Sequence, residues 1–195
     1  MAKKIGISID DVVRAAAEIA DRSGLENLTL AKVAELLGAR SPSLYAHVDG
    51  LPGLRRELQL HAARELNSAF EDSVGALEGR DALQAIARTY RRFAIHHPGL
   101  FASLLPSPKP GEDDEVYNAL AEPAMLVAGI VAGSGVSDEE AIPVVRAIRS
   151  AIHGFVVLEM TGGFGMPYDI DESFETTIEL VIGDLFGQVP TPPAT

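Results

Sequence analysis

The 195-residue chain contains no cysteine, which excludes disulfide bridges and cysteine-ligated zinc sites. It also lacks a run of about 18 to 20 uncharged apolar residues, the length that crosses a bilayer. Residues 1–11 include two lysines but no apolar signal core. Because 47% of the residues are hydrophobic and 23% are charged, we expect a soluble cytoplasmic protein with a real core and no membrane segment.

Acidic residues exceed basic ones, and the excess is confined to one part of the chain. Residues 1–66 hold nine Lys/Arg and nine Asp/Glu, so this part is neutral. The other 7 basic and 19 acidic residues carry the whole net charge of −12. Since DNA repels an acidic body, this asymmetry favours nucleic-acid contact through the neutral N-terminal part, if there is any.

Three short helices are predicted near the N-terminus, over residues 8–24, 29–38 and 41–48. Their predicted N-caps are Ser8 (in a capping box with Asp11), Thr29 and Ser41 (followed by Pro42), and the first two helices end at Gly24 and Gly38. Two short helices joined by a glycine-containing turn are typical of a helix-turn-helix motif.

Longer helical patterns follow a break at residues 49–53, and no strand alternation is present. They run from Leu54 to about Leu77, from Asp81 to His97, from about Asp113 to Ala132, from Ser137 (with Glu140 as a second capping box) to Met160, and from about Asp171 to Phe186. The sequence therefore predicts an all-α fold with a helix-turn-helix domain over residues 5–52, a larger helical domain over 53–187 and a disordered tail over 188–195.

The segment from Val12 to Val48 resembles the DNA-binding domain of tetracycline-repressor-type (TetR family) regulators. The resemblance lies in the order of an apolar helix, Gly24, Leu28-Thr29, Val33-Ala34, Leu37-Gly38 and Ser43-Leu44-Tyr45-Ala46-His47. The segment from Arg149 to Gly165 also resembles the regulatory domain of one subgroup. The resemblance implies DNA contacts by Thr29, Lys32, Arg40, Ser41, Pro42, Ser43, Tyr45, Ala46 and His47.

One position departs from the family pattern. Where the family often has a lysine that grips the DNA backbone at the start of the fourth helix, this chain has Leu51. Either Arg55 or Arg56, one turn later, is a candidate replacement.

Catalytic and metal-binding patterns are not apparent. The histidines are scattered without the spacing of a metal site, and the Gly162-Gly163-Phe164-Gly165 run follows a helix rather than a strand, so it is not a nucleotide fingerprint. We therefore expect neither an enzyme nor a cofactor.

The larger domain has candidates for an effector site and for a dimer interface. A small apolar effector is expected to contact Tyr90, Phe93, His97, Phe101, Leu104, Met125, His153, Val156, Met160 and Phe164, with Glu159 as a further polar group. A homodimer is expected through the helices Ser137–Met160 and Asp171–Phe186, with close approach at Ala147, Ala151 and Gly154 and added area from Ile148, Ile152 and Phe155.

Together these features predict a ligand-responsive transcriptional regulator, most simply a repressor, that binds a palindromic operator as a homodimer and is released by a small apolar effector. Two alternatives remain at this stage: a helical enzyme or small-molecule carrier whose N-terminal helices only pack, and a DNA-binding regulator that senses a protein.

Overall fold

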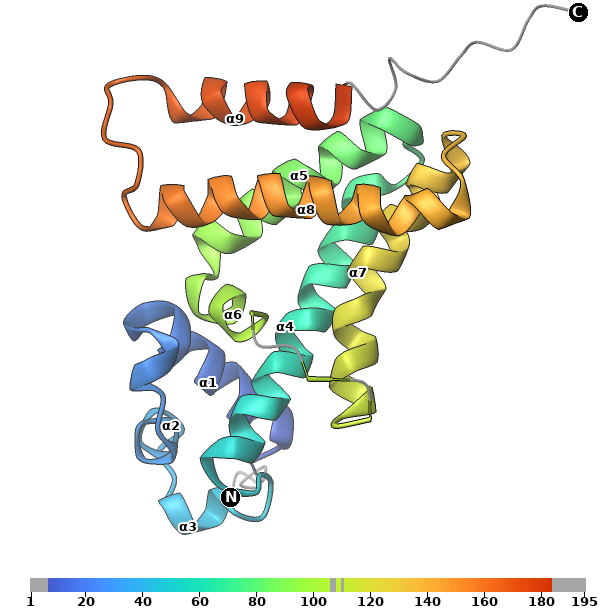
Figure 1. Cartoon of the computed structure of the whole chain (residues 1–195). Coiled ribbons are helices and arrows are strands. Elements are labelled where there is room, and N and C mark those ends of the chain that lie inside the picture. Colours follow the sequence, from blue (N-terminus) through green and yellow to red (C-terminus); the bar gives the residue numbers. More distant parts are fainter. Residues whose placement is uncertain (1–6, 106–107, 110, 184–195) are drawn as a thin grey trace, which may run out of the picture. The chain divides into compact units, whose positions relative to one another are not determined.

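The computed structural model describes residues 7–105, 108–109 and 111–183, so the tail predicted over 188–195 lies outside the described residues. Every regular element in these ranges is a helix, which confirms the all-α prediction (Figure 1). The chain divides into two compact units, unit 1 with residues 1–66 and 96–120 and unit 2 with residues 67–95 and 121–195. The domain boundary predicted between residues 52 and 53 falls inside the first turn of a helix, and the division of tasks between the domains remains a prediction.

Unit 1 is built from short helices around the beginning of a long one. It contains α1 (Ile9–Ser23), a 3₁₀ turn (Leu25–Asn27), α2 (Leu30–Leu36), α3 (Ser41–Leu44), the first part of α4 (Gly50–Val74), α6 (Pro98–Ser103) and the start of α7 (Asp114–Gly133). Side chains from four of these helices are fully buried, among them Val12, Ala16, Val33, Leu44, Leu54 and Leu58. These apolar contacts hold the short helices in place, because isolated helices of this length are unstable in water.

The first two helices begin where their caps predict. Ser8 and Asp11 form the capping box of α1, in which the Ser8 Oγ accepts from the Asp11 N–H at 3.2 Å and the carboxylate accepts from the Ser8 N–H at 3.0 Å. The Ser8 hydroxyl also donates to this carboxylate at 2.7 Å, and this bond, with the one from the Ser8 N–H and the nearby Arg14, lowers the pKa of Asp11 to about 2. Thr29 Oγ1 caps α2 by accepting from the Lys32 N–H at 3.3 Å.

Three predicted boundaries near the turn are wrong. The third helix is shorter than expected, ending at Leu44, and its N-cap is Arg40 rather than Ser41. The break predicted over residues 49–53 lies largely inside α4, which begins at Gly50. Pro52 is compatible with this start because the N–H groups of a first helical turn need no intrahelical acceptor.

A close contact joins α1 to α6 within unit 1. Asp21 of α1 accepts from the backbone N–H groups of Gly99 at 2.8 Å and Leu100 at 3.0 Å, and its other oxygen lies 3.0 Å from His97 Nδ1. A Cβ added at Gly99 would overlap the carbonyl group of Ala20. Only glycine therefore permits this approach of the two helices.

Unit 2 contains the longer helices of the C-terminal part. They are the end of α4, α5 (Gly79–His96), the rest of α7, α8 (Asp138–Met160) and α9 (Ile170–Ile178), which continues as a π-helical turn (Glu179–Gly183). Ser137 is the N-cap of α8 as predicted, but its hydroxyl donates to Glu140 at 2.8 Å instead of capping a backbone N–H. Both α7 and α8 contain an internal proline, Pro123 and Pro143, and each helix continues through it.

Helix α9 is held to the rest of unit 2 by an apolar face and by ion pairs. Phe174, Ile178 and Ile182 are buried at i, i+4 and i+8, and Phe174 packs against Phe155 of α8 with ring centroids 5.1 Å apart. Arginines of α5 pair with acidic residues of α9 and the turn that continues it: Arg80 with Glu179, Arg88 with Glu175, and Arg91 with Asp171.

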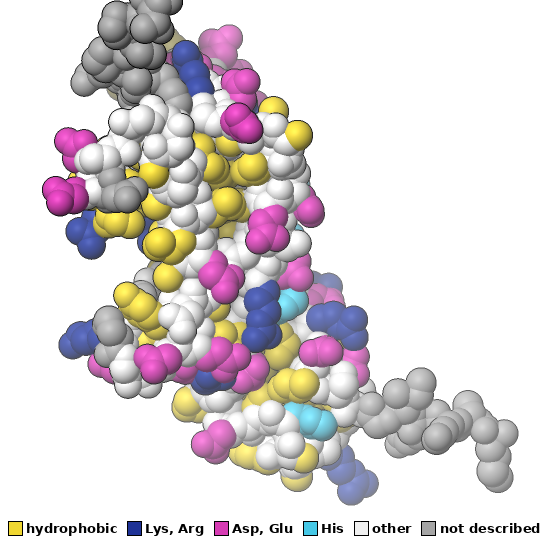
Figure 2. Space-filling view, turned by 90° about the vertical axis from the view of Figure 1, so that its right-hand side faces the viewer, with side chains coloured by type: hydrophobic (Ala, Val, Ile, Leu, Met, Phe, Trp, Pro, Cys, Tyr) yellow, Lys and Arg dark blue, Asp and Glu magenta, His cyan; other side chains and the backbone are white. Residues whose placement is uncertain are grey.

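Two helices, spanning Asp114–Gly133 and Glu139–Met160, are long and apolar enough to cross a membrane by length and composition alone. Neither helix is an uncharged apolar run, because Glu122 lies in α7 and Arg146 and Arg149 lie in α8. Only 22% of the window in α7 and 33% of that in α8 is buried within the single chain. Figure 2 views the molecule from the side on which α7 lies, and hydrophobic side chains (yellow) gather in the upper part of this view. Unit 2 thus leaves apolar helix surface uncovered.

Candidate DNA-binding surface

Helices α2 and α3 pack together within unit 1. Val33 and Ala34 of α2 and Leu44 of α3 are buried, and Val48 after α3 is buried as well. Gly38, at a φ of 61°, lets the chain turn between the helices, and the Ala39 N–H then donates to the Ala34 carbonyl at 2.8 Å. The apolar side chains thus fix which residues of α3 face solvent.

The residues expected to read DNA lie on the outside of this motif. Tyr45 is 62% exposed, although a large aromatic ring is more often buried. Pro42, Ser43 and Ala46 are also exposed, while Ser41 is half-buried. These are the positions that the resemblance assigns to base and phosphate contacts, and the roles of the individual residues remain predictions.

The other predicted contacts differ in their availability. Thr29 is exposed, but its hydroxyl oxygen caps α2. The Lys32 Nζ donates to the Asn27 carbonyl at 2.9 Å, and His47 is half-buried. Arg40 is exposed, and its guanidinium has no ion pair within the part of the chain that the structure describes. Of the predicted cationic contacts, Arg40 is therefore the more accessible.

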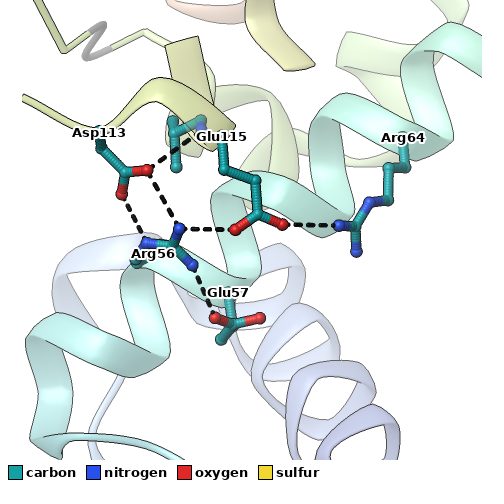
Figure 3. Close-up of polar contacts among 6 residues, drawn as sticks. Arg56, Glu57, Arg64, Asp113 and Glu115 are labelled. Carbon is teal, nitrogen blue, oxygen red and sulfur yellow. Dashed lines mark hydrogen bonds and ion pairs between the residues drawn. The ribbon is translucent and has the colours of Figure 1, made fainter. Parts of the chain in front are cut away.

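The two arginines one turn after Leu51 have different environments (Figure 3). Arg56 donates to both carboxylate oxygens of Asp113, at 2.5 and 3.0 Å, and to Glu57 at 3.0 Å and Glu115 at 2.7 Å. The hydrogen bonds to Asp113 and Glu115 raise the pKa of Arg56. In turn, the hydrogen bond from Arg56 lowers the pKa of the Asp113 carboxyl group below its usual value. Arg55 is exposed and, among the described residues, has no such partner. Nothing in the sequence pattern pointed to Asp113 and Glu115 as partners of Arg56.

Part of the predicted effector site is brought together inside unit 2. The Tyr90 hydroxyl lies 2.9 Å from His153 Nδ1, and Phe70 lies beside Tyr90 with ring centroids 6.4 Å apart. Burial raises the pKa of Tyr90 to about 12 and, with a smaller effect from Arg149, lowers the pKa of His153. The pair is thus an uncharged donor and acceptor near neutral pH. Phe93 and Val156 are buried in the same unit.

The remaining predicted effector contacts are dispersed. His97, Phe101 and Leu104 belong to unit 1, where His97 pairs with Asp21. Met125 is 60% exposed, and Met160 and Phe164 are exposed as well, so these side chains are not enclosed by their own chain. Glu159 is occupied by Arg91, whose Nε and Nη2 lie 2.7 and 2.6 Å from its carboxylate oxygens. The effector contacts of all these residues remain predictions.

Within the described residues, no group of three or more histidine, aspartate or glutamate side chains is arranged to hold a metal ion.

Comparison with known proteins identifies the family. Residues 83–181 match the family model described as the tetracyclin repressor-like C-terminal domain. An HTH-type transcriptional regulator from Mycobacterium tuberculosis is 36% identical over 163 residues, covering 83% of this chain and 74% of the relative. The HTH-type transcriptional regulator YobS from Bacillus subtilis is 33% identical over 186 residues, covering 95% of this chain and 96% of YobS. The chain belongs to the TetR family.

The TetR fold is also found in solved structures. A TetR variant from Acinetobacter baumannii, in complex with minocycline, superimposes with a TM-score of 0.66 at 20% identity, covering 92% of this chain and 96% of that protein. Because the relatives of this TetR family member are transcriptional regulators, the expectation of a regulator rather than an enzyme is confirmed, and the enzyme alternative is dropped.

Proposed function

We propose that this protein is a repressor that binds a palindromic operator as a homodimer and leaves it when a small molecule occupies unit 2. The observation that supports operator binding is the exposed surface of α3, where Tyr45, Ser43 and Pro42 stand out from a buried apolar scaffold. The phenol of Tyr45 suits a phosphate oxygen, and the proline ring suits a thymine methyl group. The Ser43 hydroxyl donates to the Arg40 carbonyl at 2.7 Å, so its oxygen is left to accept from a donor on a base edge. The family description as repressor-like supports the direction of regulation.

The DNA contact is tested by two substitutions with different expected effects. Arg40→Glu should weaken binding to every duplex because it reverses a free charge, whereas Ser43→Ala should change the preference at particular base pairs. Arg22→Glu is the matched charge control, since Arg22 lies on α1 and pairs with Glu18 at 2.7 Å. Binding would be measured by mobility shift on duplexes selected from a random pool. If no duplex is recovered by the unchanged protein, operator binding is refuted.

The dimer proposal rests on the outward face of α8. Small or apolar residues lie uncovered along it at spacings of three and four, namely Pro143, Ala147, Ser150 and Gly154, and a Cβ at Gly154 would meet nothing within 4 Å. Such a surface permits close approach of a second helix. The structure corrects one part of the prediction: Ile148, Ile152 and Phe155 are buried in their own subunit and do not contribute interface area.

The effector proposal rests on the Tyr90–His153 pair. An uncharged hydroxyl and imidazole among apolar side chains favour an uncharged ligand with one polar group over an ion, because moving a charge out of water costs far more free energy than burying a hydrogen-bonded polar group. Thermal-shift screening with uncharged hydrophobic compounds tests this, with His153→Phe as the variant that should lose the response. Stabilisation by charged compounds alone would contradict it.

Coupling between effector and operator is proposed to run through α4. This helix begins at Gly50 in unit 1 and ends at Val74 in unit 2, so it is continuous between them. Release requires that the effector binds more tightly to the conformation that cannot hold the operator. The size of the response is then limited by that difference in affinity.

A further inference from the structure

Between residues 7 and 66, most cationic side chains have a partner. Arg14 pairs with Asp11 at 2.6 Å, Arg22 with Glu18 at 2.7 Å and Arg64 with Glu115 at 3.2 Å. Lys32 bonds to a backbone carbonyl, and Arg56 lies among three carboxylates. Between residues 7 and 66, Arg40 and Arg55 are the cations without a partner in the described structure. One precedes α3 in the chain and the other follows it.

Arg56 is unsuited to a phosphate contact. Its guanidinium already donates four hydrogen bonds, to Asp113, Glu57 and Glu115, out of the five N–H donors that an arginine has. The surrounding carboxylates outnumber the arginines Arg56 and Arg64 in this cluster (Figure 3). A phosphate would have to displace a carboxylate from a bidentate pair and approach a site that is net negative.

Arg55 has the opposite properties. It lies four residues after Leu51, so the two share one face of α4. Side chains of a helix tilt toward its N-terminus, which carries the guanidinium of Arg55 back toward the first turn. That turn also lies at the positive end of the helix dipole. Leu54 and Leu58 are buried on another face, so Arg55 remains outside.

The Arg56 cluster also determines the direction of Arg55. Successive residues of an α-helix are separated by about 100° around its axis. Since Arg56 is held toward Asp113 and Glu115 at the start of α7, rotation of this part of α4 about its axis would break three hydrogen bonds. With Arg56 fixed, Arg55 begins about 100° around the helix from the acidic cluster and is exposed.

We infer that Arg55 contacts a DNA phosphate from the first turn of α4, at the level of Leu51, and that Arg56 is a positioning residue that aims it by anchoring α4 to α7. This inference rests on the proposed operator binding by a homodimer. Arg40 and Arg55, the cations without a described partner between residues 7 and 66, would then contact the DNA backbone from positions before and after α3 in the chain.

The test compares full-length variants on a duplex selected by the unchanged protein, with affinity measured by fluorescence anisotropy from 50 to 200 mM salt. Each phosphate contact adds about 0.9 to the slope of log affinity against log salt, so Arg55→Gln should lower the slope of a dimer by about 1.8. Over this fourfold salt range the unchanged protein should therefore weaken about tenfold more than Arg55→Gln does. The loss should be equal on a scrambled duplex, because a phosphate contact carries no sequence information.

Further variants separate contact from positioning. Leu51→Lys combined with Arg55→Gln should restore the slope, since it returns a cation to the same face. Arg56→Gln should reduce the effect of a subsequent Arg55→Gln, because Arg55 would no longer be aimed at the phosphate. Arg14→Gln, which removes a paired cation from α1, should leave the slope unchanged. Thermal melts would show that each variant is folded.

The outcomes distinguish this inference from the proposed function. If the unchanged protein selects a duplex but Arg55→Gln keeps the same slope, the role of Arg55 is refuted and operator binding stands. If Arg56→Gln lowers the slope more than Arg55→Gln, Arg56 is the contact and the assignment is reversed. If the unchanged protein binds no duplex, both proposals fail.

Discussion

Arg91 of α5 binds acidic residues of both α8 and α9, and replacing it tests how much this buried contact stabilises unit 2. Its guanidinium binds both oxygens of Glu159 on α8, at 2.7 and 2.6 Å, and Asp171 on α9 at 2.7 Å. It also lies 4.8 Å from the centroid of the Phe174 ring. The side chains of Arg91 and Glu159 are each only 15% exposed, so Arg91→Met would leave a largely buried carboxylate without its cation.

The magnitude follows from this burial. Breaking a buried pair from one side costs about 3–5 kcal/mol, whereas an exposed pair contributes about 0–1 kcal/mol. For a pair with slight exposure we expect Arg91→Met to lower the free energy of unfolding by about 3 kcal/mol. In a chain of this size that corresponds to a fall in Tm of about 6–12 °C.

Arg88 provides the matched control on the same helix. It binds Glu175 through the same two nitrogens, at 2.8 and 2.6 Å, but the two side chains are 46% and 47% exposed. Arg88→Met should therefore cost less than about 1 kcal/mol. Adding Glu159→Gln to Arg91→Met should recover part of the loss, because the unpaired charge is removed.

The assay is thermal unfolding followed by circular dichroism at one fixed protein concentration, since association would shift Tm. Equal losses for Arg88→Met and Arg91→Met would refute the reasoning from burial. Additive effects of Arg91→Met and Glu159→Gln would show that the two groups are not coupled.

Three other predictions concern the dimer, the pH dependence and a helix contact. Ala147→Glu on the outward face of α8 should convert the dimer to a monomer of about half its mass in light scattering, whereas Met125→Glu, on exposed α7 outside the proposed interface, should not. Burial lowers the pKa of His153 from its ordinary 6.5, so protonation of this side chain opposes folding. In melts from about pH 5 to 8, Tm should not depend on this group above pH 6.5 and should decrease as the pH falls below 6.5. His153→Gln should reduce that decrease. Gly99→Ala should lower the free energy of unfolding by about 1–3 kcal/mol in urea melts, since the added Cβ would overlap the α1 backbone. Gly129→Ala is the control: a Cβ there has open space within a helix, so this variant should raise the free energy of unfolding by about 0.5–1 kcal/mol.

Helix starts could be read from the sequence where the cap is local. Ser8 with Asp11, and Thr29 with the Lys32 N–H, act over three residues, so neighbouring letters contain the whole interaction. The break predicted around Pro52 was wrong, because proline is tolerated equally well in a loop and in the first turn of a helix. In the structure Pro52 lies in the first turn of α4, and Leu54 and Leu58 of that helix are buried. Their packing depends on distant parts of the chain.

The apolar pattern of α8 was also ambiguous before its neighbours were known. Both of its faces hold apolar residues, so periodicity alone could not say which one is turned inward. Packing against α9, through Phe155 and Phe174, places Ile152 and its neighbours in the subunit and leaves Ala147 and Gly154 outside. The interface prediction was therefore wrong about the large residues, and its small residues remain a proposal.

The sequence was sufficient to indicate an all-α chain with a helix-turn-helix head, because caps, turns and apolar spacing act between near neighbours. The resemblance of Val12 to Val48 to the TetR family then indicated a regulator. The sequence could not distinguish Arg55 from Arg56, which are identical in chemistry and adjacent in the chain. Asp113, 57 residues further along, makes that distinction by binding one guanidinium and leaving the other in solvent. A contact between residues so far apart forms only when the chain folds, and its effect on charge cannot be read from either segment alone.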